Sequence, residues 1–218
     1  MTVTIAGTTG ITQPTDTCTT SLVLTGSSSG TTTVQAAATA SGTITVPAGT
    51  GTLAVNGVSS NIVSGTVTAS TSGTAITYTG LPSWVKRITI TFNAVSTSGA
   101  SNILIQLGYG STTWVTTGYT GATVAASGSS TNYSGMMIVN GPAAGSSFSG
   151  SSIISLVDAA TNTWAQFGTM MDAAAASSQV SNPSGWSVAL AGTMTAVRVT
   201  MFNGTDTFDA GKVNILYE

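Results

Sequence analysis

From about residue 74 to the C-terminus, apolar and polar residues alternate, as is typical of β-strands with one buried face. The clearest example is RITITFNAV, residues 87–95, where Thr and Asn separate the apolar side chains. One face of this strand is expected to hold Ile88, Ile90, Phe92 and Ala94, and the other Thr89, Thr91 and Asn93. Further strands are predicted at residues 103–107, 135–139, 153–157, 163–170, 186–190, 194–202 and 213–217.

Gly, Ser, Asn and Pro fill the connections between these runs. Such a series of strands predicts an all-β C-terminal domain over residues 74–218, a β-sandwich of the jelly-roll type. One helical turn is predicted at residues 170–177, around the run Ala173–Ala176, with a loop as the alternative. Every Trp, Phe and Tyr lies in this part of the chain.

The residues before position 74 differ from this domain in composition and in the length of their apolar runs. Residues 1–20 are expected to form an extended arm, and residues 21–73 a β stem of short strands separated by Gly, Ser and Pro. A flexible Ser/Gly linker is the alternative for the stem. Alternation of apolar residues favours a thin prism in which several chains share one core. The residues expected in that core are Val34, Ile44, Val46, Leu53 and Val55.

Charged residues are scarce, which narrows the possible functions. They make up 5% of the 218 residues, against about 25% in an ordinary soluble domain. A surface with so little charge protects a monomer poorly against association, so a homo-oligomer is expected. The formal net charge of −2 comes without any basic patch, which argues against nucleic-acid binding.

The sequence contains few of the residue types on which catalysis usually depends. The chain has no His and one Cys, and most acid–base and nucleophilic mechanisms need titratable groups brought together. Ser is abundant, but there is no His to activate it and no Gly-x-Ser-x-Gly motif. We therefore expect a non-enzymatic protein without a cofactor.

Four aromatic residues are candidates for ligand binding. Tyr109, Trp114, Tyr119 and Tyr133 lie in a Gly/Thr/Ser-rich stretch between two predicted strands. Aromatic rings on polar loops stack well on sugars at little entropic cost. The alternative is that some of these rings cap the sandwich core. The predicted binding surface is the loop from Tyr109 to Tyr133, centred on Trp114.

Two pairs of charged residues are candidates for binding a metal ion or an anionic ligand. Asp206 and Asp209 in NGTDTFDAG could offer oxygens to Ca²⁺, although such turns more often satisfy their own backbone. No metal site is therefore assigned, and these residues remain weak candidates. Lys86 and Arg87 could contact a phosphate or glycan, but a strand-edge charge or an intersubunit salt bridge is favoured.

The N-terminal sequence has neither the basic nor the continuous apolar region of a secretory signal. No apolar stretch approaches the length of a membrane-spanning helix. Synthesis in a cytoplasm and action without membrane insertion are expected.

Three segments resemble structural proteins of tailed bacteriophages. SGTTTVQAAATASGTITVPAGTGTLAV, residues 29–55, resembles a module of tail-fibre and other minor virion proteins. GLPSWVKRITITFNAVSTSGASNILIQLG, residues 80–108, looks like the start of the globular domain that follows it there, and TFDAGKVNILYE, residues 207–218, is similar to the C-termini of that group.

The resemblance implies a virion-attached, trimeric tail or fibre protein. Its N-terminal arm would bind other virion proteins, and its C-terminal domain would contact the host surface, with a glycan as the expected ligand. The chain departs from long tail fibres in being short and without heptads. A capsid fibre, decoration or adaptor protein with a purely architectural role is the alternative, and a glycan depolymerase is a distant third.

Overall fold

A computed structural model describes residues 22–25, 31–34, 62–111, 113–125, 128–130, 134–172 and 180–218. In these residues the protein is all-β, without a helix, and every strand pairing is antiparallel. The chain divides into two compact units, Met1–Leu53 and Ala54–Glu218. In its described residues, the first unit has a hairpin in which β1 (Leu22–Thr25) pairs with β2 (Thr31–Val34). Of the expected stem core, Ile44, Val46, Leu53 and Val55 lie outside the described residues, and Val34 is the last residue of β2.

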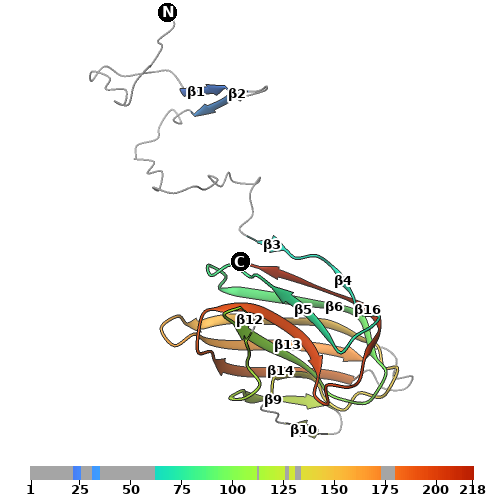
Figure 1. The fold of residues 1–218 in the computed structure, drawn as a ribbon. Helices are drawn as coiled ribbons and strands as arrows, with labels where there is room; N and C mark the ends of the chain where they lie inside the picture. Colours follow the sequence, from blue (N-terminus) through green and yellow to red (C-terminus); the bar gives the residue numbers. More distant parts are fainter. Residues whose placement is uncertain are drawn as a thin grey trace, which may run out of the picture. The chain divides into compact units, whose positions relative to one another are not determined.

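Two sheets make up the second unit (Figure 1). The order of the nine-stranded sheet is β10-β9-β14-β13-β12-β6-β16-β3, with β4 also paired to β16. Its strands are β3 (Val63–Ser64), β4 (Thr68–Ala69), β6 (Arg87–Thr97), β9 (Thr120–Ala125), β10 (Gly128–Ser130), β12 (Phe148–Asp158), β13 (Thr163–Asp172), β14 (Val180–Ala189) and β16 (Phe208–Tyr217).

The five-stranded sheet has the order β11-β7-β15-β5, with β8 paired to β7. Its strands are β5 (Ala75–Thr79), β7 (Ile103–Tyr109), β8 (Thr113–Trp114), β11 (Met136–Val139) and β15 (Met194–Met201). Because β3 and β4 pair with β16, the second unit includes residues that we assigned to the stem. The predicted boundary at residue 73 is therefore too late.

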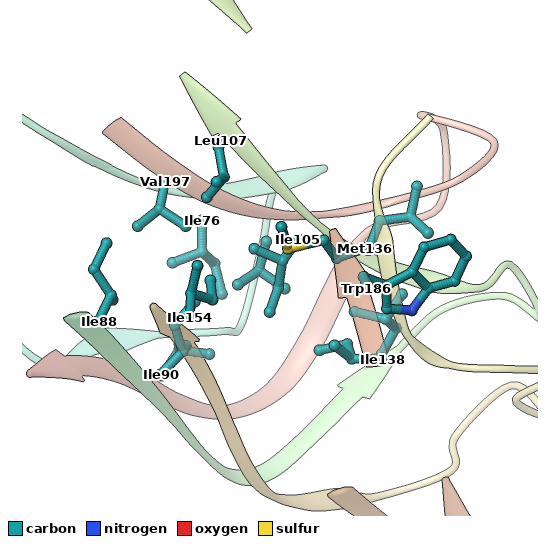
Figure 2. Packing of buried hydrophobic residues seen from close by; sticks show 14 of the residues in the cluster. Ile76, Ile88, Ile90, Ile105, Leu107, Met136, Ile138, Ile154, Trp186 and Val197 are labelled. Carbon is teal, nitrogen blue, oxygen red and sulfur yellow. The ribbon is translucent and has the colours of Figure 1, made fainter. Parts of the chain in front are cut away.

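One hydrophobic core lies between the two sheets. Strands such as β6 and β16 contribute the apolar half of an alternating pattern, as expected for a sheet with one covered face, whereas β7 and β11 are buried on both faces. Figure 2 shows side chains of both sheets meeting there: Ile76, Leu107 and Val197 from one, and Ile88, Ile90 and Ile154 from the other. This shared core makes the second unit a sandwich of two antiparallel sheets.

The strands predicted from alternation are present, with two local corrections. Ala94 was expected on the buried face of β6, but it is exposed and has a φ of 50°. A β-bulge at this point shifts the register of β6 against both β12 and β16. The predicted helical turn is also wrong at its start, because residues 170–172 belong to β13. Residues 173–179 lie outside the described residues.

Gly211 of β16 faces this bulge and explains how it is accommodated. Gly211 has a φ of 95°, and a Cβ placed on it would lie 2.3 Å from the carbonyl oxygen of Ala94. Ala94 donates its backbone N–H to the Ser149 hydroxyl of β12. The bulge therefore depends on a glycine in one neighbouring strand and a serine in the other.

We predict that Gly211→Ala destabilises the second unit by about 2–5 kcal/mol, because it combines left-handed strain with a backbone collision. Gly204→Ala is the matched control, since Gly204 has a φ of 69° but no atom within 4 Å of an added Cβ. The control should lose only about 1–2 kcal/mol. Urea unfolding of both variants measures the difference, and equal losses would contradict the role given to Gly211.

Candidate functional site

Trp114 lies on the outer face of the five-stranded sheet. Its strand β8 pairs with β7, and Trp114 is the register partner of Gly108. A Cβ on Gly108 would lie 3.1 Å from the indole ring. Because Gly108 lacks that Cβ, the ring can lie against the sheet, where it is half-buried. The residue at the centre of the predicted binding surface is thus held by the fold and still reaches solvent.

Arg198 of β15 completes the arrangement around this ring. Its guanidinium carbon lies 4.6 Å from the centroid of the Trp114 ring, a cation–π contact. Its Nε donates a hydrogen bond of 2.8 Å to Oε1 of Gln106, its register partner on β7. The Gln106 side chain is only 5% exposed and donates its Nε2–H to the carbonyl of Ser134. Gln106 therefore links Arg198 to the segment that precedes β11.

The electrostatics of this cluster follow from burial. Partial burial lowers the pKa of Arg198, and the nearby Tyr119 acts in the opposite direction. Among the residues that the structure describes, Arg87 and Glu218 form the one ion pair. The charged guanidinium of Arg198 therefore contacts an amide and an aromatic ring, and it has no acidic partner in the described chain.

Tyr119 corrects one of the predicted ligand residues. Its side chain is fully buried, and its hydroxyl accepts a 2.9 Å hydrogen bond from the N–H of Leu107 and donates to the carbonyl of Val115. A ring in this position cannot stack on an external ligand. The alternative given for the aromatic loop, that some rings cap the core, holds for Tyr119.

The other two tyrosines give no support to a ligand role. Tyr109 is half-buried, packs against the core, and lies close to Gly192, where an added Cβ would be 3.2 Å from its ring. Tyr133 lies outside the described residues. Of the predicted aromatic residues, Trp114 alone is described with a ring on the outer face of a sheet and a charged neighbour.

The acidic loop is a turn around Asp206 that is also hydrogen-bonded to the segment just before β7. Asp206 accepts hydrogen bonds from the Asn203 amide and from the N–H of Ser101, and the Asn203 Oδ1 accepts from the N–H groups of Thr205 and Asp206. Asp209 is exposed on β16. No group of three or more His, Cys, Asp or Glu side chains that could hold a metal occurs in the described part of the chain. The Asp206 carboxylate thus holds its own turn and binds the backbone of the segment just before β7.

Lys86 and Arg87 belong to the other end of the same unit. Arg87 forms its ion pair within the chain, with the side chain of the C-terminal Glu218. Trp84 stacks on Tyr217 nearby, with ring centroids 5.9 Å apart. These contacts tie the start of β6 to the end of β16.

Sequence reasoning missed Arg198 and Gln106. A signal was present, because each is a polar residue inside an otherwise apolar run, VRV in β15 and LIQL in β7. What no pattern revealed is that the two strands are neighbours in register and that Trp114 joins them. The site is thus assembled from three separate strands.

Comparisons add no relative from which a function can be transferred. No protein-family model matches the chain, and neither a curated protein nor a solved structure matches it. In the described residues, no helix has the length and hydrophobicity needed to cross a membrane. The geometry of the outer faces is therefore the basis for assigning a function.

We predict that stability falls in alkaline solution partly through Tyr119. Burial raises the pKa of Tyr119 to about 12, although the Leu107 N–H and Arg198 oppose the rise. Because the folded pKa exceeds the unfolded value of about 10, this stabilisation is complete below pH 10 and is lost as the pH rises towards 12. The loss between about pH 9 and 12 should be about 2 kcal/mol from this residue.

Urea unfolding across this pH range measures the loss, with Tyr119→Phe as the comparison. The variant should be less stable at about pH 9, because two buried backbone groups lose a partner, but its stability should depend less on pH. Identical pH dependence in the two proteins would contradict the prediction.

Proposed function

We propose that the protein is a structural component of a bacteriophage virion, a homotrimeric tail or fibre protein whose C-terminal unit contacts glycans on the host surface. The observation that carries the proposal is the Trp114–Arg198 pair, fixed by the buried Gln106 on an outer sheet face. A ring already held in place loses little entropy when it stacks on a sugar. The three segments that resemble phage structural proteins support the same class.

Strand order supports the jelly-roll form of this proposal. An eight-stranded jelly roll has two four-stranded sheets with the orders 1-8-3-6 and 2-7-4-5. The order β5-β15-β7-β11 corresponds to the first sheet, and β6, the meander β12-β13-β14, β9 and β10 correspond to the second. In this comparison, the three strands β12, β13 and β14 together replace one strand of the jelly roll. The strand β16 pairs with β6 and extends the sheet beyond it.

The outer face of β12, β13 and β14 supports oligomerisation with further copies of this chain. Phe167 is 68% exposed and lies directly across from Ile153, and Met171 follows Phe167 on the same side of β13. The other outward residues of these strands are uncharged except Asp158, which is exposed at the end of β12. The uncharged ones are Ser149, Ser151, Ser155, Thr163, Ala165, Thr169, Ser181, Pro183, Gly185, Ser187 and Ala189.

The size of this face suits an interface between subunits. With the neighbouring strands β6 and β9 it covers roughly 750 Å², from strand spacing and rise. A stable interface covers about 800 Å² on each partner. A second copy, itself almost uncharged, is the partner with matching chemistry. This face also favours the second candidate function, an architectural capsid or adaptor protein, since such a protein needs only contacts between copies and neighbours.

Trp114→Ala should reduce adsorption of phage particles to host cells by about tenfold or more, because each weak site is repeated on the trimer. Trp84→Ala is the matched control, since Trp84 is an exposed tryptophan that stacks on Tyr217 elsewhere in the unit. Normal adsorption of the Trp114→Ala particles would favour the architectural function. Labelling of the protein on particles by electron microscopy separates a tail position from a capsid position.

Phe167→Glu should increase the monomer fraction at micromolar concentration, because it places a charge in an apolar contact between copies. Phe202→Glu is the control, since Phe202 is 57% exposed in the turn after β15. Sedimentation velocity over a concentration series measures the change. An unchanged distribution for Phe167→Glu would exclude this face from the interface and leave the stem as the predicted site of assembly.

A further inference from the structure

The fold fixes the direction in which Arg198 projects. Its neighbours Val197 and Val199 are fully buried in the core, so the alternation of β15 turns Arg198 towards the outer face. The Gln106 amide holds Nε, and the Trp114 ring lies beside the guanidinium carbon. Neither contact uses the two terminal NH₂ groups, which form the part of a guanidinium that binds anions in pairs of hydrogen bonds.

This cation has no anion within the described chain. All charged residues except Asp16 are described. The carboxylates of Asp158 and Asp206 accept hydrogen bonds from their own turns, and Glu218 pairs with Arg87. A partly buried charge is favoured when an opposite charge binds it, so Arg198 is arranged to receive an anion from outside.

Two hydroxyl groups border the same surface. Thr77 of β5 is the register partner of Arg198, and Thr79 is the partner of Ala196. Both threonines are exposed, whereas the preceding residue Ile76 is buried in the core. Tyr78, which lies between the two threonines in the strand, donates its hydroxyl to the carbonyl of Val213 in the other sheet. Thr77 and Thr79 therefore face outward beside Arg198.

We propose that this surface, made by Trp114, Arg198, Thr77 and Thr79, binds a carboxylated sugar, with the carboxylate on the Arg198 terminal nitrogens. The indole contacts the apolar face of the sugar ring, and the threonine hydroxyls bind its hydroxyl groups. This inference rests on the proposed host-contact function and names the class of glycan: an acidic polysaccharide.

The test measures binding of galacturonate and galactose oligosaccharides of equal length to the full-length protein by isothermal titration calorimetry. The wild-type protein should bind the galacturonate oligosaccharide about tenfold more tightly, because a charge-assisted pair forms only with the carboxylate. The difference should shrink in about 0.5 M salt, which screens exposed charges. Phosphorylated galactose is the third probe, and its tighter binding would overturn the assignment of a carboxylate.

Arg198→Gln should remove the preference for galacturonate, and Arg198→Lys should retain only part of it, because a lysine keeps the charge without the planar fork. Arg87→Gln is the matched control, with the same change in charge at the Glu218 ion pair. Near-UV circular dichroism and urea midpoints confirm that each variant is folded. Equal affinity for the two sugars, an unchanged preference in Arg198→Gln, or no binding of galacturonate at about 10 mM would overturn the inference.

Adsorption of phage particles separates this inference from the proposed function. If Trp114→Ala abolishes adsorption and Arg198→Gln leaves it unchanged, the surface binds a neutral ligand, so the inference fails while the function stands. If neither variant changes adsorption, both fail. Loss of adsorption in both variants, with Arg87→Gln adsorbing normally, supports both.

Discussion

The hydrophobic core between the two sheets is the interaction on which the rest of the structure depends. Strands alternate with a period of two, so each residue buried in this core sets its neighbours on an outer face. Ile76 and Val197 are buried, and Thr77 and Arg198 consequently face outward. The same packing that stabilises the unit therefore determines which polar residues are presented to solvent.

The two outer faces have different chemistry. The five-stranded sheet presents a charge and an aromatic ring, both held by contacts within the sheet. The nine-stranded sheet presents small polar side chains around Phe167 and Ile153, and the one exposed charge on β12, β13 and β14 is Asp158 at the end of β12. A face with fixed polar groups is suited to a ligand, and a broad uncharged face is suited to another copy of the chain. The proposals assign one role to each face.

Charged residues are few in this chain, and several of them have a defined structural role. Arg87 and Glu218 tie the start of β6 to the chain end, and Asp206 holds the turn that follows β15. Arg198 differs from these residues because its partners are an amide and an aromatic ring. In a chain with ordinary charge density, an arginine of this kind would be one of many, whereas here it is one of four Lys and Arg residues, and an amide and an aromatic ring hold it in place.

Several features of the fold could be predicted from sequence because they are local. Alternation over residues 88–92, 163–170 and 194–201 marks one buried face, and strands β6, β13 and β15 occur there. The strands β9 and β10 were missed because Gly, Ala, Ser and Thr give no contrast between two faces. The strand β5 was also not predicted, since it is short and begins where the short apolar runs give way to longer alternating strands.

By itself, the sequence determined the all-β class, the main strands and the scarcity of charged side chains, since alternation and composition can be read from the sequence alone. Tertiary structure decided which strands pair, and with it the site. Trp114 and Tyr119 lie five positions apart in one polar loop, yet one ring reaches solvent and the other fills the core. Ala94 leaves the buried face because Gly211 and Ser149 come from other strands. Contacts between residues distant in sequence set both outcomes, and no local pattern encodes them.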